Sequence, residues 1–377
     1  MSAGLYVHIP FCLRKCAYCD FVSFADLSNM QPYLDALDRE IVMRSKDSAF
    51  SSFDTVFIGG GTPSLLSPEA FARILDRLRA SFDISDNAEI SIESNPGTLD
   101  AKKLRQYRAC GVNRLSMGLQ SSDDALLSRI GRIHTYADFL NSYELARSAG
   151  FDNINVDIMY GLPGQSVKQY ESTLQTLCSL SPAHISAYSL ILEENTPLFS
   201  SHGDLPGEDE TYAMHVLSRE FLADKDYERY EISNYALPGR ECRHNLHYWN
   251  DENYLGLGLN AHSAWRLDGK WTRFANTAAL PKYIEKISAG EFAEAENTQI
   301  TFKDEMFEFI MLGLRKTAGI SYDAFQKRFK TSVAQSFPRA LYALREQGYI
   351  CEDNEFLRLN ERGLDMQNRA LLLFMDE

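Results

Sequence analysis

The sequence lacks the segments that would insert the chain into a membrane or export it. Within its 377 residues, no apolar run approaches the ~20 residues needed to span a bilayer. The first residues have neither the basic region nor the apolar stretch of a secretory signal peptide. We therefore expect a cytoplasmic protein.

The chain also has fewer basic residues than acidic ones. Lys and Arg total 38 against 52 Asp and Glu, which gives a formal net charge of −14. A strongly acidic protein is a poor general partner for phosphate backbones, so we expect no nucleic acid partner. The chain shows no internal repeat and no low-complexity segment. Its 45% apolar residues indicate a globular protein with a substantial core, and its length suits two domains.

Cysteine is scarce, and its placement is uneven. There are seven cysteines, an odd number, and four of them are isolated: Cys110, Cys178, Cys242 and Cys351. This distribution argues against a disulfide framework and fits a reducing cytoplasm.

The other three cysteines are Cys12, Cys16 and Cys19, in the spacing C-x3-C-x2-C directly after the apolar run Leu5–Ile9. Thiolates are soft ligands that suit zinc or iron–sulfur clusters. A structural zinc site needs four ligands, and no fourth cysteine lies nearby. Three thiolates on a four-iron cluster would leave one iron open to a cofactor. A zinc site completed by a distant His or Cys is the alternative.

Strand-like and helix-like segments alternate along the first two thirds of the chain, which predicts a parallel sheet. The expected strands are Leu5–Ile9, Asp54–Ile58, Ala88–Pro96, Val112–Gly118, Asn153–Met159 and His184–Leu190. The expected helices are Gln31–Arg44, Pro68–Ala80, Asp100–Cys110, Tyr136–Ala149, Val167–Leu180 and Glu208–Lys225. Alternation alone fits a barrel and a doubly wound sheet equally well.

Candidate ligand-binding residues cluster at or beyond the carboxyl ends of these strands, as in barrel enzymes. The run Gly59–Pro63 allows close backbone approach to a ligand. Glu93 could accept hydrogen bonds from ribose hydroxyls, and Arg132 is a bidentate donor suited to a carboxylate. Asp157 lies inside a buried strand, where an unpaired charge is costly and a cofactor partner is expected.

The cysteine spacing and the sequence Gly59-Gly-Gly-Thr-Pro63 resemble the signatures of the radical S-adenosylmethionine (SAM) superfamily. The resemblance implies an open, partial (β/α)6 TIM-like barrel with a [4Fe–4S] cluster on Cys12, Cys16 and Cys19. The amino and carboxylate groups of SAM would chelate the fourth iron, and reduction would cleave SAM to a 5′-deoxyadenosyl radical. The expected SAM-binding residues are Tyr6, Tyr18, Gly60, Gly61, Thr62, Glu93, Gln120, Arg132 and Asp157. Tyr6 and Tyr18 could equally be ordinary core aromatics.

A second motif follows the barrel segment. His244 and His247 lie three residues apart among aromatic side chains, an arrangement that can ligate a metal or heme or form a hydrogen-bonded loop corner. The pattern His244-Asn245-x-x-Tyr248-Trp249 resembles the HNxxYW motif of the heme-chaperone branch of the coproporphyrinogen oxidase-like family. The resemblance implies heme binding near His244, with His247 as the fallback and neither histidine as the third alternative. Asn260 stands where the branch usually has a glycine.

The last part of the chain changes character. Glu305–Leu314, Tyr322–Phe329 and Val333–Gln347 read as helices, followed by a hairpin over Tyr349–Leu359 that turns at Asp353-Asn354. We expect three regions: the barrel (1–235), a connecting region (236–302) and a winged-helix-like domain (303–377). Because the last domain has no basic excess, we expect it to act as a lid or a docking surface.

Two functions follow from the resemblance: a heme chaperone and an oxygen-independent coproporphyrinogen III oxidase. The oxidase extends its motif to C-x3-C-x2-C-x-C, whereas this chain has Phe21 at the last position. The oxidase also carries a longer segment before the motif, and the HNxxYW pattern fits the chaperone. We therefore expect a chaperone without coproporphyrinogen oxidase activity and assign no catalytic residue. SAM cleavage without a substrate reaction, and a radical reaction on another tetrapyrrole, remain open.

The expected partners of such a chaperone are heme, heme-accepting proteins that include respiratory proteins at the membrane, and a second copy of the chain. The cluster could control heme release or dimerisation.

Overall fold

The computed structural model describes residues 3–47, 49, 52–201 and 204–375. Its central element is an open twelve-stranded sheet, in the order β12-β11-β10-β9-β1-β2-β3-β4-β5-β6-β8-β7. Six consecutive strands of this sheet run parallel to one another. They are β1 (Gly4–Ile9), β2 (Ser52–Gly60), β3 (Asp83–Ser94), β4 (Arg114–Gln120), β5 (Ile154–Tyr160) and β6 (His184–Ser189). They agree with the six strands that the sequence predicts.

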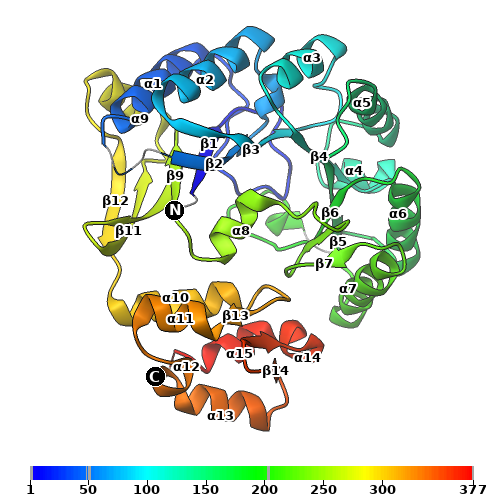
Figure 1. Ribbon diagram of the computed structural model, residues 1–377. Helices are drawn as coiled ribbons and strands as arrows, with labels where there is room; N and C mark the ends of the chain where they lie inside the picture. The colour runs from blue at the N-terminus through cyan, green and yellow to red at the C-terminus, as the bar shows by residue number, and fades with distance from the viewer. Residues whose placement is uncertain (1–2, 48, 50–51, 202–203, 376–377) are drawn as a thin grey trace.

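Helices follow these strands and cover the outer, convex side of the curved sheet (Figure 1). They are α1 (Met30–Arg44), α2 (Pro68–Ser81), α3 (Ala101–Ala109), α4 (Asp124–Arg129), α5 (Tyr136–Ser148), α6 (Val167–Ser179) and α7 (Glu208–Ala223). Local signals fix several of their starts. Ser67 accepts a hydrogen bond from the Ala70 amide at the start of α2, and capping boxes begin at Thr135 and Ser166. Among these helices on the convex side, only the short α4 has no counterpart in the predicted helices.

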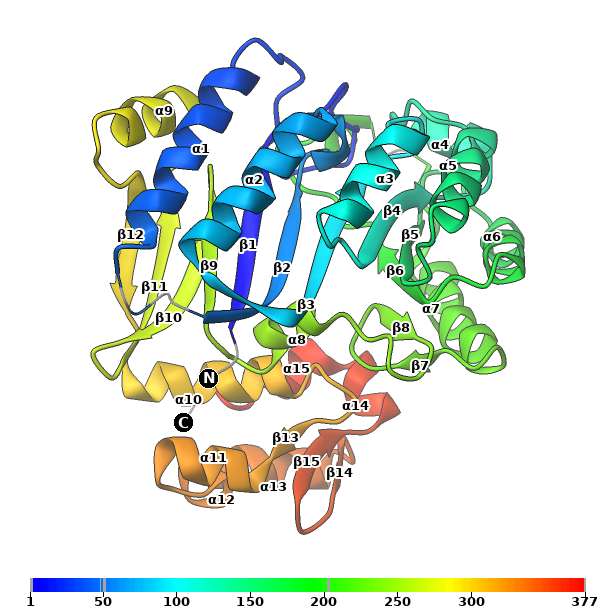
Figure 2. The ribbon, with the colours of Figure 1, turned by 45° about the horizontal axis from the view of Figure 1, so that its top comes forward.

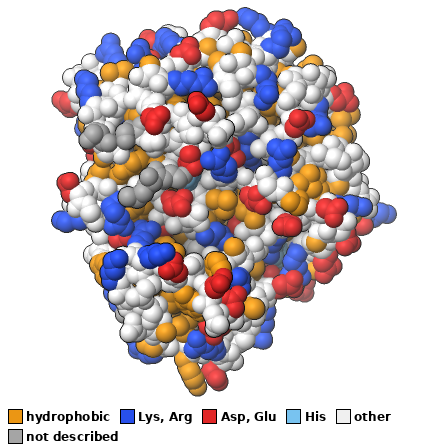
Figure 3. Space-filling model, in the orientation of Figure 1, with side chains coloured by type: hydrophobic (Ala, Val, Ile, Leu, Met, Phe, Trp, Pro, Cys, Tyr) orange, Lys and Arg blue, Asp and Glu red, His pale blue; other side chains and the backbone are white. Residues whose placement is uncertain are grey.

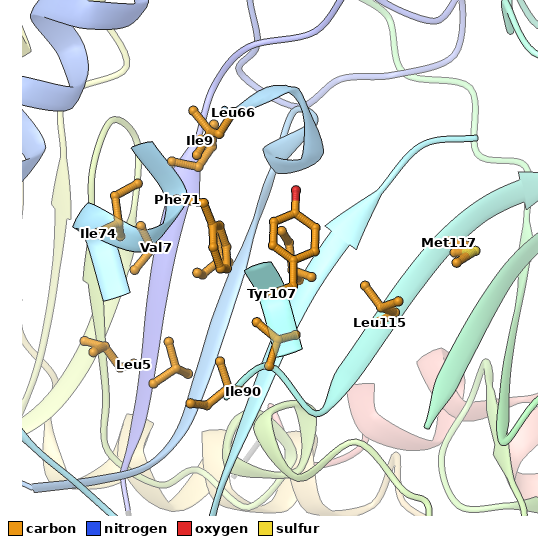
Figure 4. Close-up of a cluster of buried hydrophobic side chains, with 14 of the residues drawn as sticks. Leu5, Val7, Ile9, Leu66, Phe71, Ile74, Ile90, Tyr107, Leu115 and Met117 are labelled. Carbon is orange, nitrogen blue, oxygen red and sulfur yellow. The ribbon is translucent and has the colours of Figure 1, made fainter. Parts of the chain in front are cut away.

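Strand residues that face the helices form the main apolar core. Leu5, Val7 and Ile9 of β1 and Leu115 and Met117 of β4 are fully buried. Figure 4 shows them beside side chains from α2 and α3, such as Phe71 and Tyr107. Successive residues of a strand point to opposite sides of the sheet. The residues between these apolar positions therefore face the interior of the barrel.

The predicted connecting region, residues 236–302, is largely part of the same sheet. It begins at the end of β8 (Asn234–Ala236), which forms one edge of the sheet with β7 (Glu228–Arg229), and continues into α8 (Arg243–Trp249). At the other edge it adds β9 (Tyr254–Leu257), β10 (His262–Leu267), β11 (Lys270–Asn276) and β12 (Glu294–Gln299), with helix α9 (Leu280–Ser288) packed on α1. Strand β9 pairs in parallel with β1, so the barrel extends beyond the six predicted strands.

The C-terminal domain has a separate apolar core. Its elements are α10 (Phe302–Gly313), β13 (Ile320–Ser321), α11 (Tyr322–Phe329), α12 (Val333–Ser336), α13 (Pro338–Glu346), β14 (Ile350–Glu352), β15 (Phe356–Leu359), α14 (Glu361–Asp365) and α15 (Gln367–Leu372). The predicted single helix over Val333–Gln347 is wrong: Pro338 lacks an amide hydrogen and begins a new helix. The hairpin turns where predicted, because Asp353 accepts the amides of Glu355 and Phe356.

This domain lies beneath the end of the barrel at which the parallel strands begin (Figure 2). Arg328 donates to the Asp251 carbonyl at 2.8 Å, and the Thr317 amide donates to the Tyr230 carbonyl at 3.1 Å. The cysteine loop follows the opposite end of β1. The domain therefore does not cover the cysteine loop, and its role as a lid or a docking surface stays a prediction.

Acidic and basic side chains are interspersed over the face shown in Figure 3, without a continuous basic field. In the described part of the chain, no helix combines the length and the apolar character needed to cross a membrane.

Candidate functional site

The three motif cysteines lie on one loop at the carboxyl end of β1. The loop is closed at its base, where the Cys12 amide donates to the Phe24 carbonyl at 2.9 Å and the Phe24 amide donates to the Pro10 carbonyl at 2.8 Å. A further turn forms where the Cys19 amide donates to the Cys16 carbonyl. All three cysteines line one cavity of about 140 Å³, which we call the cluster pocket.

No three His, Cys, Asp or Glu side chains of the described residues converge closely enough to hold a single metal ion. An iron–sulfur cluster places a different iron under each thiolate, so its ligands stand further apart around a pocket. Three cysteines that line one pocket are a ligand set that suits such a cluster.

The glycine run packs directly against the cysteine loop. Gly60 has a φ of +113°, and a Cβ atom there would lie 2.6 Å from the His8 ring. A Cβ atom on Gly61 would lie 2.7 Å from the Phe11 carbonyl oxygen. Only glycine fits these positions. The amides of Gly60, Gly61 and Thr62 donate to Glu93, Ile9 and Phe11. An ammonium group is a donor only, so a ligand's amino group here would donate to carbonyl oxygens of the segment.

A chain of polar side chains ties Arg132 to the cysteines. One Arg132 nitrogen donates to the Asn95 amide oxygen at 2.8 Å, and another lies 3.6 Å from Cys16 Sγ. Asn95 donates to the Thr62 hydroxyl at 2.8 Å, and that hydroxyl lies 3.4 Å from Cys12 Sγ. Arg132 Nε is buried without a hydrogen-bond partner. A carboxylate ligand next to the cluster would supply that partner.

Glu93, Gln120 and Asp157 line the cluster pocket with Gly60, Gly61 and Arg132. Burial, together with the nearby Asp157, raises the pKa of Glu93 to about 7. Burial also raises the pKa of Asp157. Gln120 has a φ of +69° and lies beside a register irregularity between β4 and β5. A strained non-glycine backbone at a pocket is typical of functional sites.

The two predicted aromatic contacts separate in the structure. Tyr18 lines the cluster pocket. Tyr6 instead lies deeper in the barrel, where its ring is 6.2 Å from the Phe57 ring and 6.5 Å from the His244 ring. Thr62 lines a neighbouring depression that also contains Asn95 and Arg132.

A second, larger cavity occupies the inside of the barrel and has a volume of about 800 Å³. We call it the barrel cavity. It shares Tyr18, Cys19 and Phe21 with the cluster pocket, so the two are contiguous. At the other end, His244, Asn245 and Tyr248 of α8 line it. Cys19 and three residues of the HNxxYW motif therefore line the same interior space.

Both motif histidines are buried, and both nitrogens of each ring have partners. His244 bonds to the Thr55 hydroxyl and the Tyr248 hydroxyl, each at 2.8 Å. His247 bonds to Asp54 at 2.9 Å and to Glu252 at 2.7 Å. Of the two, only His244 lines the barrel cavity. An iron could reach its Nε2 only after Tyr248 moves away.

Several cavity residues were not predicted from the sequence. Arg114, Ser116, Asn155, Ser186 and Tyr188 line the barrel cavity from β4, β5 and β6. Ser116, Asn155 and Ser186 each lie between buried apolar residues of their strands. Arg114 and Tyr188 continue the same alternation near the strand ends. Polar residues at every second position of three buried strands were the signal that could have revealed a solvent- or ligand-filled interior.

Comparison with known proteins places the chain in a family context. The radical SAM superfamily model matches residues 6–177, and the HemN C-terminal domain model matches residues 300–366. A heme chaperone HemW from Bacillus subtilis is 37% identical over 99% of both chains. The Escherichia coli heme chaperone HemW is 34% identical over 99% of this chain and 98% of its own length.

Among solved structures, the coproporphyrinogen III oxidase HemN from Escherichia coli, described as a radical SAM enzyme, superimposes with a TM-score of 0.87. The match has 25% identity and covers 99% of this chain and 90% of that one.

Proposed function

We propose a function from one premise: the chain belongs to the family of the HemW heme chaperones, within the radical SAM superfamily. The proposal is that the chain binds heme inside the barrel, beside a [4Fe–4S] cluster and SAM, and delivers the heme to heme proteins. Radical SAM family membership implies the cluster and SAM. The chain's own residues suggest where each ligand would bind.

Cys12, Cys16 and Cys19 would hold the cluster, which when bound supplies an open iron for SAM and an electron for its cleavage. Arg132, with its unpartnered Nε, would hold the SAM carboxylate, and carbonyl groups of the Gly60–Thr62 segment would receive its amino group. Glu93, Gln120, Asp157 and Tyr18 would contact the remainder of SAM. Tyr6, which lines the barrel cavity together with Tyr18 and Glu93, would also contact SAM.

The observation that carries the heme proposal is the barrel cavity. Its volume of about 800 Å³ lies toward the upper end of the roughly 300–1,000 Å³ range of ligand pockets. Aromatic side chains of Tyr6, Phe57 and Tyr188 line it and offer flat apolar surface to a macrocycle. Its contiguity with the cluster pocket would bring heme close to the cluster.

His244 is the favoured heme ligand, with His247 as the fallback and ligation by neither as the third alternative. Burial and the neighbouring His247 lower the pKa of His244 to about 3, so its ring is neutral, as iron ligation requires. Heme spectra of His244→Ala and His247→Ala test this assignment. Wild-type heme affinity and an unaltered spectrum in His244→Ala would contradict it.

The second candidate function is coproporphyrinogen III oxidation, which the fold similarity to HemN supports. Two observations favour the chaperone. Identity to the HemW proteins is higher over the same length. The second is that Phe21 replaces the further cysteine of the oxidase motif; its side chain is 68% exposed.

One preparation can test both functions. The cluster is reconstituted anaerobically, heme is titrated while the Soret band is followed, and coproporphyrinogen III turnover with SAM is assayed in parallel. We expect about one heme per chain and no turnover. Decarboxylation of coproporphyrinogen III would replace the chaperone proposal with the oxidase.

We further propose a cytoplasmic protein that passes heme to acceptors which include respiratory proteins at the membrane. The C-terminal domain, which lies away from the cysteines, offers a surface for such a partner or for a second copy of the chain. Sedimentation of the reconstituted protein with and without heme measures the homodimer directly. A monomer under both conditions would contradict dimerisation.

A further inference from the structure

The deepest charged side chain of the barrel cavity belongs to Arg114, the first residue of β4. It is 2% exposed and lines the cavity. Arg114 pairs in register with Ser91, one inward position below the Ser116–Glu93 pair. It therefore lies near the end of the barrel at which the strands begin, away from the cluster pocket.

Arg114 has no dedicated partner. Within the described part of the chain, its guanidinium makes no ion pair within 4.0 Å and no hydrogen bond, and Nε is buried without a partner. Burying an isolated cation is costly. Native proteins keep such a group where a ligand satisfies it or where function requires it.

Three ionisable neighbours of Arg114 carry no charge. Burial raises the pKa of the Cys242 thiol to about 12, and burial raises the pKa of the Tyr230 hydroxyl, so both are uncharged. Burial, with the Arg114 charge, lowers the pKa of His184, which is neutral and bonded to Asn155 and Tyr230.

The two nearby carboxyl groups are occupied elsewhere. Glu89 accepts the amides of Arg243 and His244 at the start of α8. Asp157 accepts hydrogen bonds from Ser116 and Asn155. Neither lies within ion-pair distance of the Arg114 guanidinium in the described structure.

Basic and acidic side chains are unequally represented in the wall of the barrel cavity. Its other charged residues are acidic: Asp20, Glu93, Asp157 and Glu193. Arg114 is the sole Lys or Arg among the described residues that line it. Among the described residues of the cavity wall, Arg114 is therefore the basic side chain that can attract an anionic group.

We propose that Arg114 binds a propionate carboxylate of the tetrapyrrole and so fixes its orientation, with the carboxylate at the deep end of the barrel. This inference rests on the proposed heme function. A planar guanidinium matches a carboxylate with two parallel hydrogen bonds. The macrocycle then lies between Arg114 and the cluster pocket, against Tyr6, Phe57 and Tyr188.

The test compares heme with its dimethyl ester on wild type and Arg114→Met. Esterification removes the propionate charge and leaves the macrocycle unchanged. We expect wild type to bind heme roughly 10- to 100-fold more tightly than the ester. Arg114→Met should bind both porphyrins with the affinity that wild type has for the ester.

Controls separate binding from folding. Because an unpaired buried charge contributes no stability, Arg114→Met should retain its cluster and unfold at a temperature no lower than wild type. Arg114→Lys keeps the charge without the planar fork and should keep part of the preference for heme. Arg147→Met removes a 46% exposed arginine paired with Asp152 and should change neither affinity.

Three outcomes would overturn the proposal. The first is equal wild-type affinity for heme and its ester. The second is an undiminished preference for heme in a folded Arg114→Met or Arg114→Lys. The third is a lower unfolding temperature of Arg114→Met, which would assign the guanidinium to the structural network. Wild type that binds neither porphyrin would instead overturn the heme function itself, and this inference with it.

Discussion

The two sides of the barrel sheet are built from the same strands but differ in composition: one side is apolar and tightly packed, and the other is polar and lines a cavity. On the helix side of β4, Leu115, Met117 and Leu119 are fully buried in an apolar core. On the inner side, Arg114, Ser116 and Gln120 line a cavity. The outer side provides stability, whereas the inner side carries strain and a charge without a partner. We infer that a sheet whose inward side chains line a polar cavity, rather than pack in a core, is arranged to hold a ligand.

The largest expected difference between the two sides concerns the cluster. Cys12→Ser, Cys16→Ser or Cys19→Ser should abolish cluster assembly, because three thiolates are the minimum set for a cluster with one open iron. The protein should remain folded, since Cys16 and Cys19 are half-buried and the buried Cys12 is not part of the main apolar cluster. Iron and sulfide analysis after anaerobic reconstitution measures the effect. Cys351→Ser, on the exposed β14, is the control, and a full cluster in all three loop variants would contradict the assignment.

The outer side should show the reverse behaviour. Phe71→Ala in the core under α2 should destabilise the protein by about 3–5 kcal/mol, as measured by urea denaturation. Cluster content at a temperature where the variant is folded should stay unchanged. The inward Ser116→Ala should cost about 1 kcal/mol, the usual size of a lost hydrogen bond. Equal losses of stability in Phe71→Ala and Ser116→Ala would contradict the claim that the outer side contributes more to stability than the inner side.

His244 and His247, one turn apart on α8, should respond to pH in opposite directions. The His244 pKa of about 3 lies below its ordinary 6.5. Its contribution to stability is present above pH 6.5 and is lost as the pH falls from 6.5 toward 3. Burial alone would lower the pKa of His247, but hydrogen bonds and charges of Glu252 and Asp54 raise it above 6.5. Its contribution is full below pH 6.5 and is lost as the pH rises through the raised value.

Titration of the histidine ring protons by NMR separates these two residues. The His244 ring should stay neutral throughout the range between pH 4 and 8, while the His247 ring should stay protonated beyond pH 6.5. His247→Gln should remove the stability change on the alkaline side alone. If both rings titrated with a pKa near the ordinary 6.5, the hydrogen-bond partners assigned to His244 and His247 would be contradicted.

The smallest expected effect concerns backbone strain on the inner side. Gln120 holds a φ of +69°, so Gln120→Gly should relieve the strain and stabilise the fold by up to about 1 kcal/mol. The same change should weaken SAM binding, measured by equilibrium dialysis of the reconstituted protein. Asp226→Gly, with a φ of +65° after α7, should stabilise similarly without affecting SAM. Unchanged SAM affinity in Gln120→Gly would remove Gln120 from the site.

Much of this architecture could be predicted from local sequence. The six strands follow from short apolar runs, and the cysteine and glycine motifs follow from spacing. The occupied nitrogens of His244 and His247 could not be predicted, because their partners Thr55 and Asp54 lie on β2, 189 and 193 residues away in the chain. The strands that residues 236–302 add beside β1 depend on equally distant pairing. Arg114 was overlooked because one arginine at a strand start carries no local signal.

The central claim is that heme binds inside the barrel, next to the cluster. Electron paramagnetic resonance of the reduced cluster tests it directly, with cobalt(II) protoporphyrin as a paramagnetic heme substitute and zinc protoporphyrin as its diamagnetic control. Cobalt(II) protoporphyrin in the barrel cavity should shorten the spin relaxation of the cluster signal, and zinc protoporphyrin should leave it unchanged. Bound cobalt(II) protoporphyrin with no effect on the cluster signal would place the tetrapyrrole outside the barrel and contradict the account.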